Sequence, residues 1–306
     1  MSLQPKNPEA ASDRVDGNPV HSGFSVWRES MENRQGQAVR VLFIPTMGAL
    51  HEGHASLIRR ARERAMAVDG QPVEVVVSVF VNPTQFNDVR DFDGYPITPD
   101  ADVELAVAAG ADSVVMPSAD EIYPTGVPAT VHRVDYGSLT GTMEGAHRPG
   151  HFDGVVHVVR RLFQLVRPDV AFFGEKDWQQ LAVIRRLAAE EFPDLEIAPV
   201  ATVREADGLA MSSRNVRLDA EQRALAVHLS RELERVARSG QPQEEAKRAM
   251  DRLSDQGFEM EYLTVADGFT LEAAPWKAGD MRVFAAGSLG GVRLIDNMPC
   301  IGPAAP

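Results

Sequence analysis

A strand followed by a turn and a helix is predicted by residues 41–54, Val41-Leu42-Phe43-Ile44-Pro45-Thr46-Met47-Gly48-Ala49-Leu50-His51-Glu52-Gly53-His54, and the residues that follow them. Its first residues are an apolar run, which is typical of a buried strand. We expect Pro45 to end this strand, because proline has no N–H for the ladder. Gly48 and Gly53 then loosen a turn, and residues 55–65 carry apolar side chains on one helical face. A strand, a glycine-bearing loop and a helix N-terminus together predict an anion site, since backbone N–H groups and the helix dipole point at it.

Two histidines, His51 and His54, lie in this turn and would add imidazole donors for a phosphate. A purely structural turn and a zinc site are the alternatives. The zinc site lacks a third ligand at a familiar spacing. The strand-to-helix context therefore favours an anion such as a nucleotide phosphate.

Length and composition restrict the class of protein. With 306 residues and 44% hydrophobic composition, the chain can bury a substantial core, and we expect two domains. Its 31 basic and 44 acidic residues give a net charge of −13, which argues against a nucleic-acid partner but allows a small anionic substrate. The single cysteine, Cys300, and the lack of a secretory signal or a long apolar run lead us to expect a cytoplasmic protein with no membrane partner.

The order of predicted elements indicates a doubly wound α/β fold. Residues 1–22 are predicted to be a flexible extension, because their apolar residues show no regular spacing. Strands and helices alternate over 23–202, as in a Rossmann-like parallel sheet, and 203–306 reads as a smaller α+β domain. The predicted strands cover 39–44, 73–81, 113–116, 170–173, 195–200, 260–266 and 281–295, and the predicted helices cover 24–35, 55–65, 99–109, 155–166, 181–190, 219–238 and 242–256. Residues 123–150 read as a long functional loop.

Polar residues follow several of these strands, where ligands bind in an open parallel sheet. Asn82 and Gln85 follow the second strand, and residues 174–177 follow a later one. Together with the histidine turn and residues 211–215, they suit nucleotidyl transfer. In that reaction negative charge grows on phosphate oxygens, which imidazole, ammonium, guanidinium and hydroxyl groups can stabilise.

Six segments, in this order along the chain, resemble the pantothenate synthetase (pantoate–β-alanine ligase) family of the nucleotidyltransferase superfamily, which includes the class I aminoacyl-tRNA synthetases. These segments are residues 45–54, 80–86, 148–152, 173–177, 211–215 and 294–298. The resemblance implies condensation of (R)-pantoate with β-alanine through a pantoyl-adenylate, with ATP and Mg²⁺ used and pyrophosphate and AMP released. It also implies a homodimer.

The resemblance implies a role for each matching residue. His54, as proton donor, His51 and Lys176 would be catalytic, and Gln85 and Gln180 would bind pantoate through their amides, with Gln85 also touching β-alanine and Asn82 in support. The C-terminal domain would act as a mobile flap and lie at the dimer side. The residues expected to bind ATP are Met47, Gly48, Ala49, Leu50, His51, Glu52, Gly53, His54, Gly174, Glu175, Lys176, Asp177, Val203, Met211, Ser212, Ser213 and Arg214. The resemblance does not indicate which residues would bind Mg²⁺.

Three positions depart from the family pattern. Trp178 stands where tyrosine is usual, Ile97 where arginine is common, and His157 where a small polar residue is typical. We expect a packing change at Trp178, and a partly solvated helical stripe around His157. His147 and His151 are expected to lie at the surface or to pack within their loop. The acidic run at residues 88–93 is interpreted as a solvated loop rather than a metal site.

Two other functions remain open. A different adenylyltransferase of the same superfamily, acting on a nucleotide or phosphopantetheine acceptor, would need extra basic residues near the second strand. That position instead offers the uncharged Asn82, Thr84 and Gln85, which favour a small hydroxy acid. An inactive nucleotide-binding module should lack a key side chain, and none is missing.

Overall fold

A computed structural model describes residues 20–32, 38–68, 70–128, 130–275, 277 and 279–302. The chain forms two compact units, each assembled from several stretches of sequence. The prediction of contiguous domains at 23–202 and 203–306 differs from this arrangement, since two short stretches of the first predicted domain belong to the second unit. The N-terminal unit comprises residues 1–134, 148–174 and 183–200, and the C-terminal unit comprises 135–147, 175–182 and 201–306.

The extension predicted over residues 1–22 lies largely outside the described residues. The prediction is wrong at the end of this stretch, because Val20–His21 form strand β1, which pairs in parallel with β4 (Ser113–Val115). A strand of two residues is too short to show the alternation by which a strand is recognised in sequence. The sheet therefore begins inside the stretch that was predicted to be an extension.

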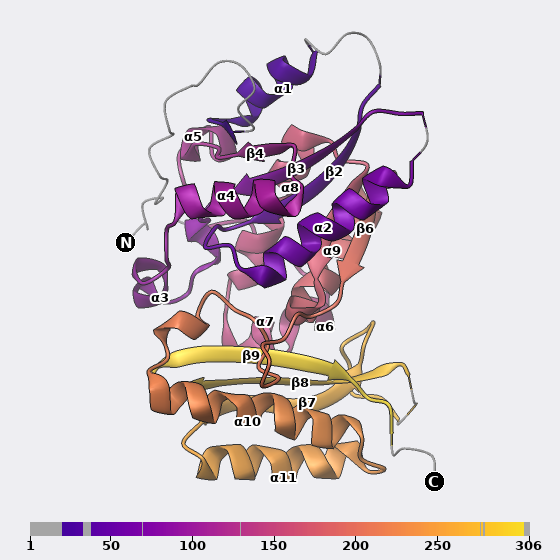
Figure 1. Cartoon of the computed structure of the whole chain (residues 1–306). Helices are drawn as coiled ribbons and strands as arrows, with labels where there is room; N and C mark the ends of the chain where they lie inside the picture. Colours follow the sequence, from indigo (N-terminus) through magenta and orange to yellow (C-terminus); the bar gives the residue numbers. More distant parts are fainter. Residues whose placement is uncertain are drawn as a thin grey trace. The chain divides into compact units, whose positions relative to one another are not determined.

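A parallel sheet of six strands forms the centre of the N-terminal unit (Figure 1), in the order β1-β4-β3-β2-β5-β6. Its inner strands are largely apolar because helices cover both faces. Phe172 packs in the cluster with α2 (Glu52–Met66), whereas the ring of Phe173 lies 6.4 Å from that of Phe163 in α8 (His151–Val166). The remaining strands are β2 (Arg40–Thr46), β3 (Val73–Val79), β5 (Val170–Gly174) and β6 (Glu196–Val200).

The helices predicted in this unit are present, with some displaced ends. Gly110, at φ 109°, ends α4 (Pro99–Ala109) as predicted. By contrast, α2 and α8 begin three to four residues before the predicted positions, because their first turns are polar and show no apolar period. The other helices are α1 (Phe24–Glu32) and α9 (Trp178–Glu191), of which residues 183–191 lie in this unit. Two short helices, α3 (Val89–Asp93) and α5 (Ala119–Ile122), were not predicted from the sequence.

Pro45 does not end its strand, contrary to the prediction. Strand β2 pairs with β3 through Pro45 and Thr46. The Thr46 carbonyl accepts the Phe80 N–H at 3.0 Å, so the polar groups of Thr46 face β3 and those of Pro45 face the β5 side. On that side β5 pairs only with Leu42 and Phe43, and a missing donor at Pro45 therefore breaks no ladder bond.

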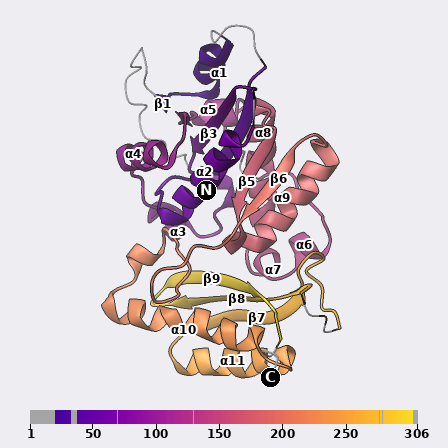
Figure 2. The ribbon, with the colours of Figure 1, turned by 45° about the vertical axis from the view of Figure 1, so that its right-hand side comes forward.

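The C-terminal unit packs two helices on an antiparallel sheet of three strands. Figures 1 and 2 show α10 (Ala220–Ala237) and α11 (Pro242–Asp255) side by side along this sheet. One predicted strand, 281–295, is in fact a hairpin of β8 (Met281–Leu289) and β9 (Val292–Pro299) that pair with β7 (Glu259–Asp267) in the order β7-β8-β9. Gly290 and Gly291, at φ 57° and 76°, form its two-residue turn, which requires positive φ at both positions.

Residues 135–147 belong to the C-terminal unit because buried polar groups attach them to it. Arg293 of β9 donates to the Glu144 carboxylate at 2.7 and 2.8 Å, and the Tyr262 hydroxyl donates to it at 2.6 Å. The buried Gln179 amide donates to the carbonyls of Leu139 and Thr142, at 3.0 and 2.9 Å. The predicted loop at 123–150 therefore contains two short helices, α6 (Ser138–Gly141) and α7 (Glu144–His147).

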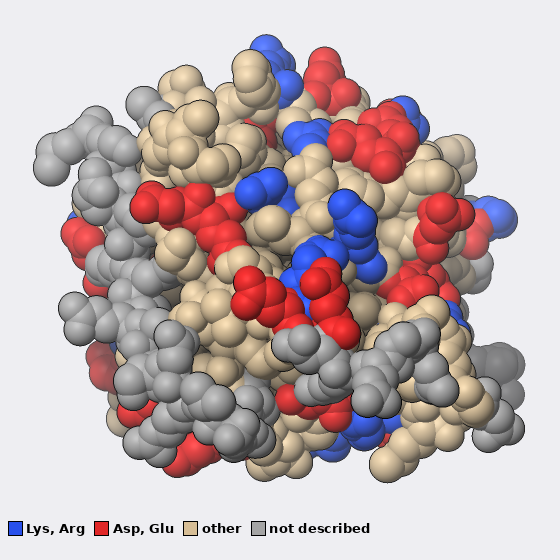
Figure 3. All heavy atoms as spheres, turned by 90° about the horizontal axis from the view of Figure 1, so that it is seen from above, with Lys and Arg blue, Asp and Glu red and all other residues tan. Residues whose placement is uncertain are grey.

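Charged side chains of both signs are interspersed on the face shown in Figure 3. Among the helices of the described ranges, none combines the length and the apolar character that crossing a bilayer requires.

A close backbone approach in the N-terminal unit predicts a stability effect. A Cβ added to Gly154 of α8 would lie 2.3 Å from the Thr84 carbonyl oxygen and 2.8 Å from the Gln85 nitrogen. We expect Gly154→Ala to lower the free energy of unfolding by about 1–3 kcal/mol, since α8 must move away from the turn at Thr84. Urea denaturation measures the change. Gly141→Ala, whose Cβ would meet nothing within 4 Å, is the control, and equal effects of the two substitutions would contradict the explanation.

Candidate functional site

The loops at the carboxyl ends of β2 and β5 lie where the strand order reverses. From β2 the chain passes through β3 to β4 on one side, whereas β5 and β6 lie on the other side of β2. Ligands bind outside the carboxyl ends of the strands at such a switch point. The loop after β2 begins at Met47, and β5 ends at Gly174, so two predicted ATP-binding segments start at this edge.

His51 caps the N-terminus of α2 with an extended backbone, at φ −138° and ψ 179°. Its Nδ1 accepts the Gly53 N–H at 3.1 Å, and His54 Nδ1 accepts the His51 N–H at 3.3 Å. A ring nitrogen that accepts a hydrogen bond carries no proton, so each neutral imidazole has its proton on Nε2. The two ring centroids lie 4.2 Å apart. The turn thus places two imidazole N–H groups beside a helix N-terminus, where the dipole favours an anion.

A buried carboxylate that the sequence analysis did not single out holds the loop before these histidines. Asp102 of α4 is 2% exposed and accepts the N–H groups of Ala49 and Leu50, at 3.0 and 2.7 Å. Burial raises the pKa of Asp102, and the hydrogen bonds from Leu50, Thr98 and Ala49 oppose that rise. The contact is close, since a Cβ on Gly48 (φ 79°) would lie 2.8 Å from the carboxylate. The only signal in the sequence was an acidic residue in the first turn of a helix.

The predicted residues Gln85, Asn82 and Met47 lie together in the N-terminal unit. The Gln85 Oε1 accepts from Asn82 Nδ2 at 3.0 Å, and Gln85 Nε2 contacts the Met47 sulfur at 3.0 Å. Asn82 is 1% exposed, and its Oδ1 accepts from the hydroxyls of Thr84 and Tyr123. Because these donors fix the orientation of the Asn82 amide, Asn82 in turn orients the amide of Gln85.

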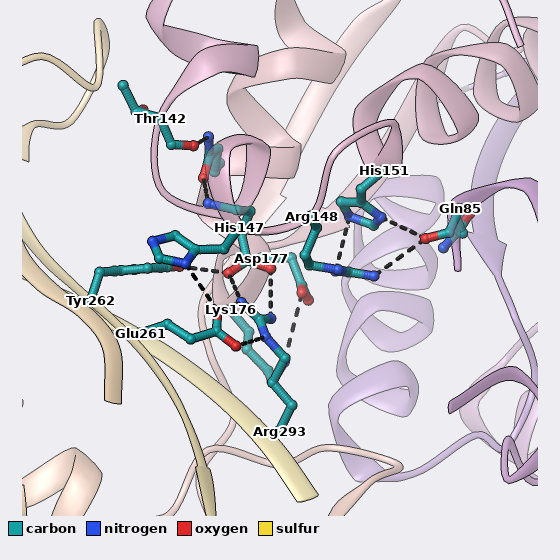
Figure 4. Close-up of polar contacts among 12 residues, drawn as sticks. Gln85, Thr142, His147, Arg148, His151, Lys176, Asp177, Glu261, Tyr262 and Arg293 are labelled. Atoms are coloured by element: carbon teal, nitrogen blue, oxygen red, sulfur yellow. Dashed lines mark hydrogen bonds and ion pairs between the residues drawn. The ribbon is translucent and has the colours of Figure 1, made fainter. Parts of the chain in front are cut away.

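Arg148 and His151 contact the backbone of Gln85 (Figure 4). His151 Nδ1 lies 2.8 Å and Arg148 Nη2 lies 3.3 Å from the Gln85 carbonyl oxygen. Arg148 Nη1 also lies 3.1 Å from His151 Nε2, and a guanidinium can only donate, so His151 carries its proton on Nδ1 and donates to Gln85. In the C-terminal unit, His147 lies 3.8 Å from the Glu261 carboxylate. His147 ends α7 and His151 begins α8, and both have partners outside the loop in which they were expected to pack.

The three departures from the family pattern differ in their surroundings. His157 stacks on Tyr123, with ring centroids 5.4 Å apart. The hydroxyl of the same Tyr123 donates to Asn82. Trp178 lies under the guanidinium of Arg282 and donates through Nε1 to the Gly268 carbonyl at 2.7 Å. Trp178 therefore makes a cation–π contact and a hydrogen bond in addition to the packing change that was expected. Ile97 is an exposed apolar side chain.

Lys176 and Asp177 belong to the C-terminal unit, within the 3-10 turn η2 (Glu175–Asp177). Lys176 Nζ lies 3.7 Å from Asp177 Oδ1, and the lysine side chain is 19% exposed. This partial burial keeps the charge from being fully screened by water. Figure 4 shows Lys176 and Asp177 beside each other.

The segment from Val203 to Arg214 closes on itself at its base. The Met211 N–H donates to the Val203 carbonyl at 3.0 Å, and Arg204 and Ala210 form an isolated antiparallel bridge. The Ser212 hydroxyl accepts the Arg214 N–H at 3.3 Å, which makes a tight turn. The predicted ATP-binding residues 203 and 211–214 are therefore joined at one end of a loop.

The predicted site residues fall into two sets, one in each unit. The N-terminal unit holds Met47, Gly48, Ala49, Leu50, His51, Glu52, Gly53, His54, Asn82, Gln85 and Gly174, and the C-terminal unit holds Glu175, Lys176, Asp177, Gln180, Val203, Met211, Ser212, Ser213 and Arg214.

The acidic run at residues 88–93, interpreted from the sequence as a solvated loop, is instead the short helix α3 with its N-cap. The Asp88 carboxylate caps α3 and pairs with Arg90 at 2.9 Å. Within the described parts of the chain, no group of three or more His, Cys, Asp or Glu residues is placed to hold a metal ion.

Comparison with known proteins decides the family. A family model described as pantoate-beta-alanine ligase matches residues 20–299. The chain belongs to this family. A pantothenate synthetase from a Nocardioides species is 48% identical over 276 residues, which cover 87% of this chain and 81% of that protein.

Solved members of the pantoate–β-alanine ligase family share the fold. Pantothenate synthetase from Thermus thermophilus has a TM-score of 0.80 at 39% identity, and the match covers 92% of this chain and 99% of that one. The enzyme from Francisella tularensis, solved with beta-gamma ATP and β-alanine, has a TM-score of 0.76 at 30% identity, with 92% and 98% covered. The predicted family, Rossmann-like fold class and enzyme activity, the ligation of pantoate and β-alanine, are thereby confirmed.

The surroundings of His157 predict a pH effect on stability. Burial lowers the pKa of His157, and the charges of Arg160 and His132 lower it further. Below the unfolded-state pKa of about 6.5 the unfolded chain binds more protons than the folded chain at this residue, so stability falls as the pH falls. We expect His157→Gln to reduce the loss of unfolding free energy between about pH 7 and pH 5.5. Urea denaturation at both pH values checks this, and parallel losses in the two proteins would contradict it.

Proposed function

We propose that this enzyme forms pantothenate through a pantoyl-adenylate, with the phosphates of ATP bound at the N-terminus of α2. The pantoate carboxylate attacks the α-phosphorus, a C–O–P bond forms, and the bond to pyrophosphate breaks. The amine of β-alanine then attacks the acyl carbon, the amide forms, AMP leaves, and the amine gives up a proton. The observation that carries this proposal is the pair of histidines at the N-terminus of α2 whose Nδ1 atoms accept backbone N–H groups, which assigns the ring protons to Nε2.

His51 and His54 would donate from Nε2 to phosphate oxygens as negative charge grows on them. His54 is our candidate for the proton donor to the leaving pyrophosphate. The backbone at Ala49 and Leu50, held by Asp102, would fix where the loop meets the nucleotide. Such preorganised donors stabilise a transition state without moving during the reaction.

The second set of residues would bind the rest of ATP. Lys176 would neutralise phosphate charge, and Asp177 would bond the ribose hydroxyls. Val203 and residues 211–214 would cover the adenine and exclude water from the acyl-adenylate, which hydrolysis would otherwise destroy. The partial burial of Lys176 supports this role, because a desolvated ammonium interacts more strongly with phosphate.

Gln85 and Gln180 would bind pantoate, since an amide can both donate to its carboxylate and accept from its hydroxyls. Gln85 would also touch β-alanine, with Asn82 holding its amide. Mg²⁺ would arrive as MgATP, because Mg²⁺ commonly keeps its waters and is bound mainly through phosphates.

The first experiment measures pyrophosphate release from MgATP with pantoate present, with and without β-alanine. We expect release to depend on pantoate, and AMP and pantothenate to appear only when β-alanine is added. His54→Ala should slow pyrophosphate release about 10²–10³-fold, the cost of removing one charge-stabilising donor. His228→Ala on α10 is the control, because His228 lies outside every segment assigned to a substrate.

Two outcomes would contradict these assignments. Release at the wild-type rate by His54→Ala would remove the role given to His54. Turnover without pantoate but with a nucleotide-like acceptor would reassign the enzyme to another adenylyltransferase class.

We also propose a cytoplasmic homodimer. The single cysteine accords with a reducing compartment, and the pantoate–β-alanine ligase family to which the chain belongs supports the dimer. Light scattering should give a mass twice the 33.4 kDa of one chain. A mass of one chain at micromolar concentration would refute the dimer.

A further inference from the structure

Strand β9 carries two adjacent polar residues, Asp296 and Asn297, that are each 4% exposed. They belong to the family-like segment 294–298, to which neither the sequence nor the proposed function has given a role. Successive side chains of a strand point to opposite faces of the sheet. Burying a polar group is unfavourable unless it is fully hydrogen-bonded, so the partners of these two side chains indicate what each one does.

Asn297 holds the backbone of the turn that carries Lys176. Its Nδ2 donates to the Glu175 carbonyl at 2.9 Å and to the Lys176 carbonyl at 2.8 Å. Its Oδ1 accepts from Arg282 Nε and Nη2, at 2.9 and 2.6 Å. Because the guanidinium can only donate, the amide has one orientation, with both N–H groups toward the turn. Arg282 lies 3.6 Å from the centre of the Trp178 ring, which follows the same turn.

Asp296 holds the base of the other segment. Its two carboxylate oxygens accept from Arg204 Nη1 and Nη2, at 2.7 and 2.9 Å, in a bidentate pair. Arg204 also donates to the Gly208 carbonyl at 3.1 Å, across the loop that it begins. The Asp296 carboxylate accepts the Asn297 N–H at 2.7 Å, so the two side chains are linked through one peptide bond.

We propose that Asp296 and Asn297 are positioning residues for ATP, which set the Lys176 turn and the segment from Val203 to Arg214 at a fixed separation. This inference rests on the proposed function, because it takes both segments to bind ATP. Neither residue need touch the nucleotide. Adjacent residues of a paired strand have a nearly constant spacing, so each segment is held relative to the other by a single rigid element.

A purely structural role would lower stability without changing ATP binding, and the experiment separates the two. Asn297→Asp keeps the acceptor for Arg282 but removes both donors to the turn. Arg204→Lys keeps the charge beside Asp296 but removes the bidentate pair. Glu232→Gln is the matched control, since Glu232 is also a buried carboxylate, 5% exposed, that accepts twice from one arginine, Arg252, at 2.9 and 2.6 Å.

ATP binding is measured by calorimetry on the full chain without pantoate, and initial rates are measured separately. We expect Asn297→Asp and Arg204→Lys each to raise the Kd of ATP about tenfold or more and to raise the KM for ATP more than the KM for pantoate. Glu232→Gln should change the Kd of ATP less than about twofold, even if it lowers the melting temperature as much.

An unchanged Kd of ATP in both folded variants, or an equal rise in Glu232→Gln, would overturn the positioning role. If one variant does not fold, as judged by circular dichroism, the other carries the test, because each addresses one of the two segments. Failure of the proposed function is distinguishable, because the wild-type enzyme would then release no pyrophosphate in response to pantoate.

Discussion

The loop between β2 and α2 depends on one buried carboxylate. The chain must leave the carboxyl end of a central strand at Thr46 and enter a helix at Glu52, and several N–H groups of the connection are bonded within the protein rather than turned toward a ligand. Asp102 accepts two of these N–H groups, at Ala49 and Leu50. The position of His51, and with it the cap of α2, follows from that constraint. Without an acceptor at this point the loop would carry two unpaired, partly buried donors.

A buried polar side chain also holds two other segments that are assigned to a substrate. Asn82 is saturated by its neighbours and bonds the amide of Gln85. Asn297 has every polar atom of its amide engaged and holds the turn of Lys176. In each case a buried amide or carboxylate bonds a second group that is more exposed. A fully satisfied polar network has one arrangement, and it therefore rigidifies the groups at its edge.

Local patterns were enough to predict most of the fold. The apolar runs of β3 and β5 and the periodic faces of α2, α10 and α11 are visible in sequence because each buries a regular face. The errors lie where that signal is weak or where pairing decides the outcome. Strand β1 has only two residues. Pro45 remains in β2 because β5, on the side that its backbone faces, pairs with β2 only at Leu42 and Phe43. The hairpin at Gly290-Gly291 needed its two glycines to be interpreted as a turn.

Sequence by itself determined the family, most of the strands and longer helices, and which residues carry donors suited to phosphate and to a hydroxy acid. These follow from residue types and short spacings, which are properties of neighbouring positions. The tertiary structure alone decided which residues hold that chemistry in place. Asp102 meets Ala49, Asn297 meets Lys176, and Asp296 meets Arg204 across 53, 121 and 92 positions of the chain. No local pattern encodes a contact of that range, because it arises only when packed elements bring distant backbone groups within hydrogen-bond distance.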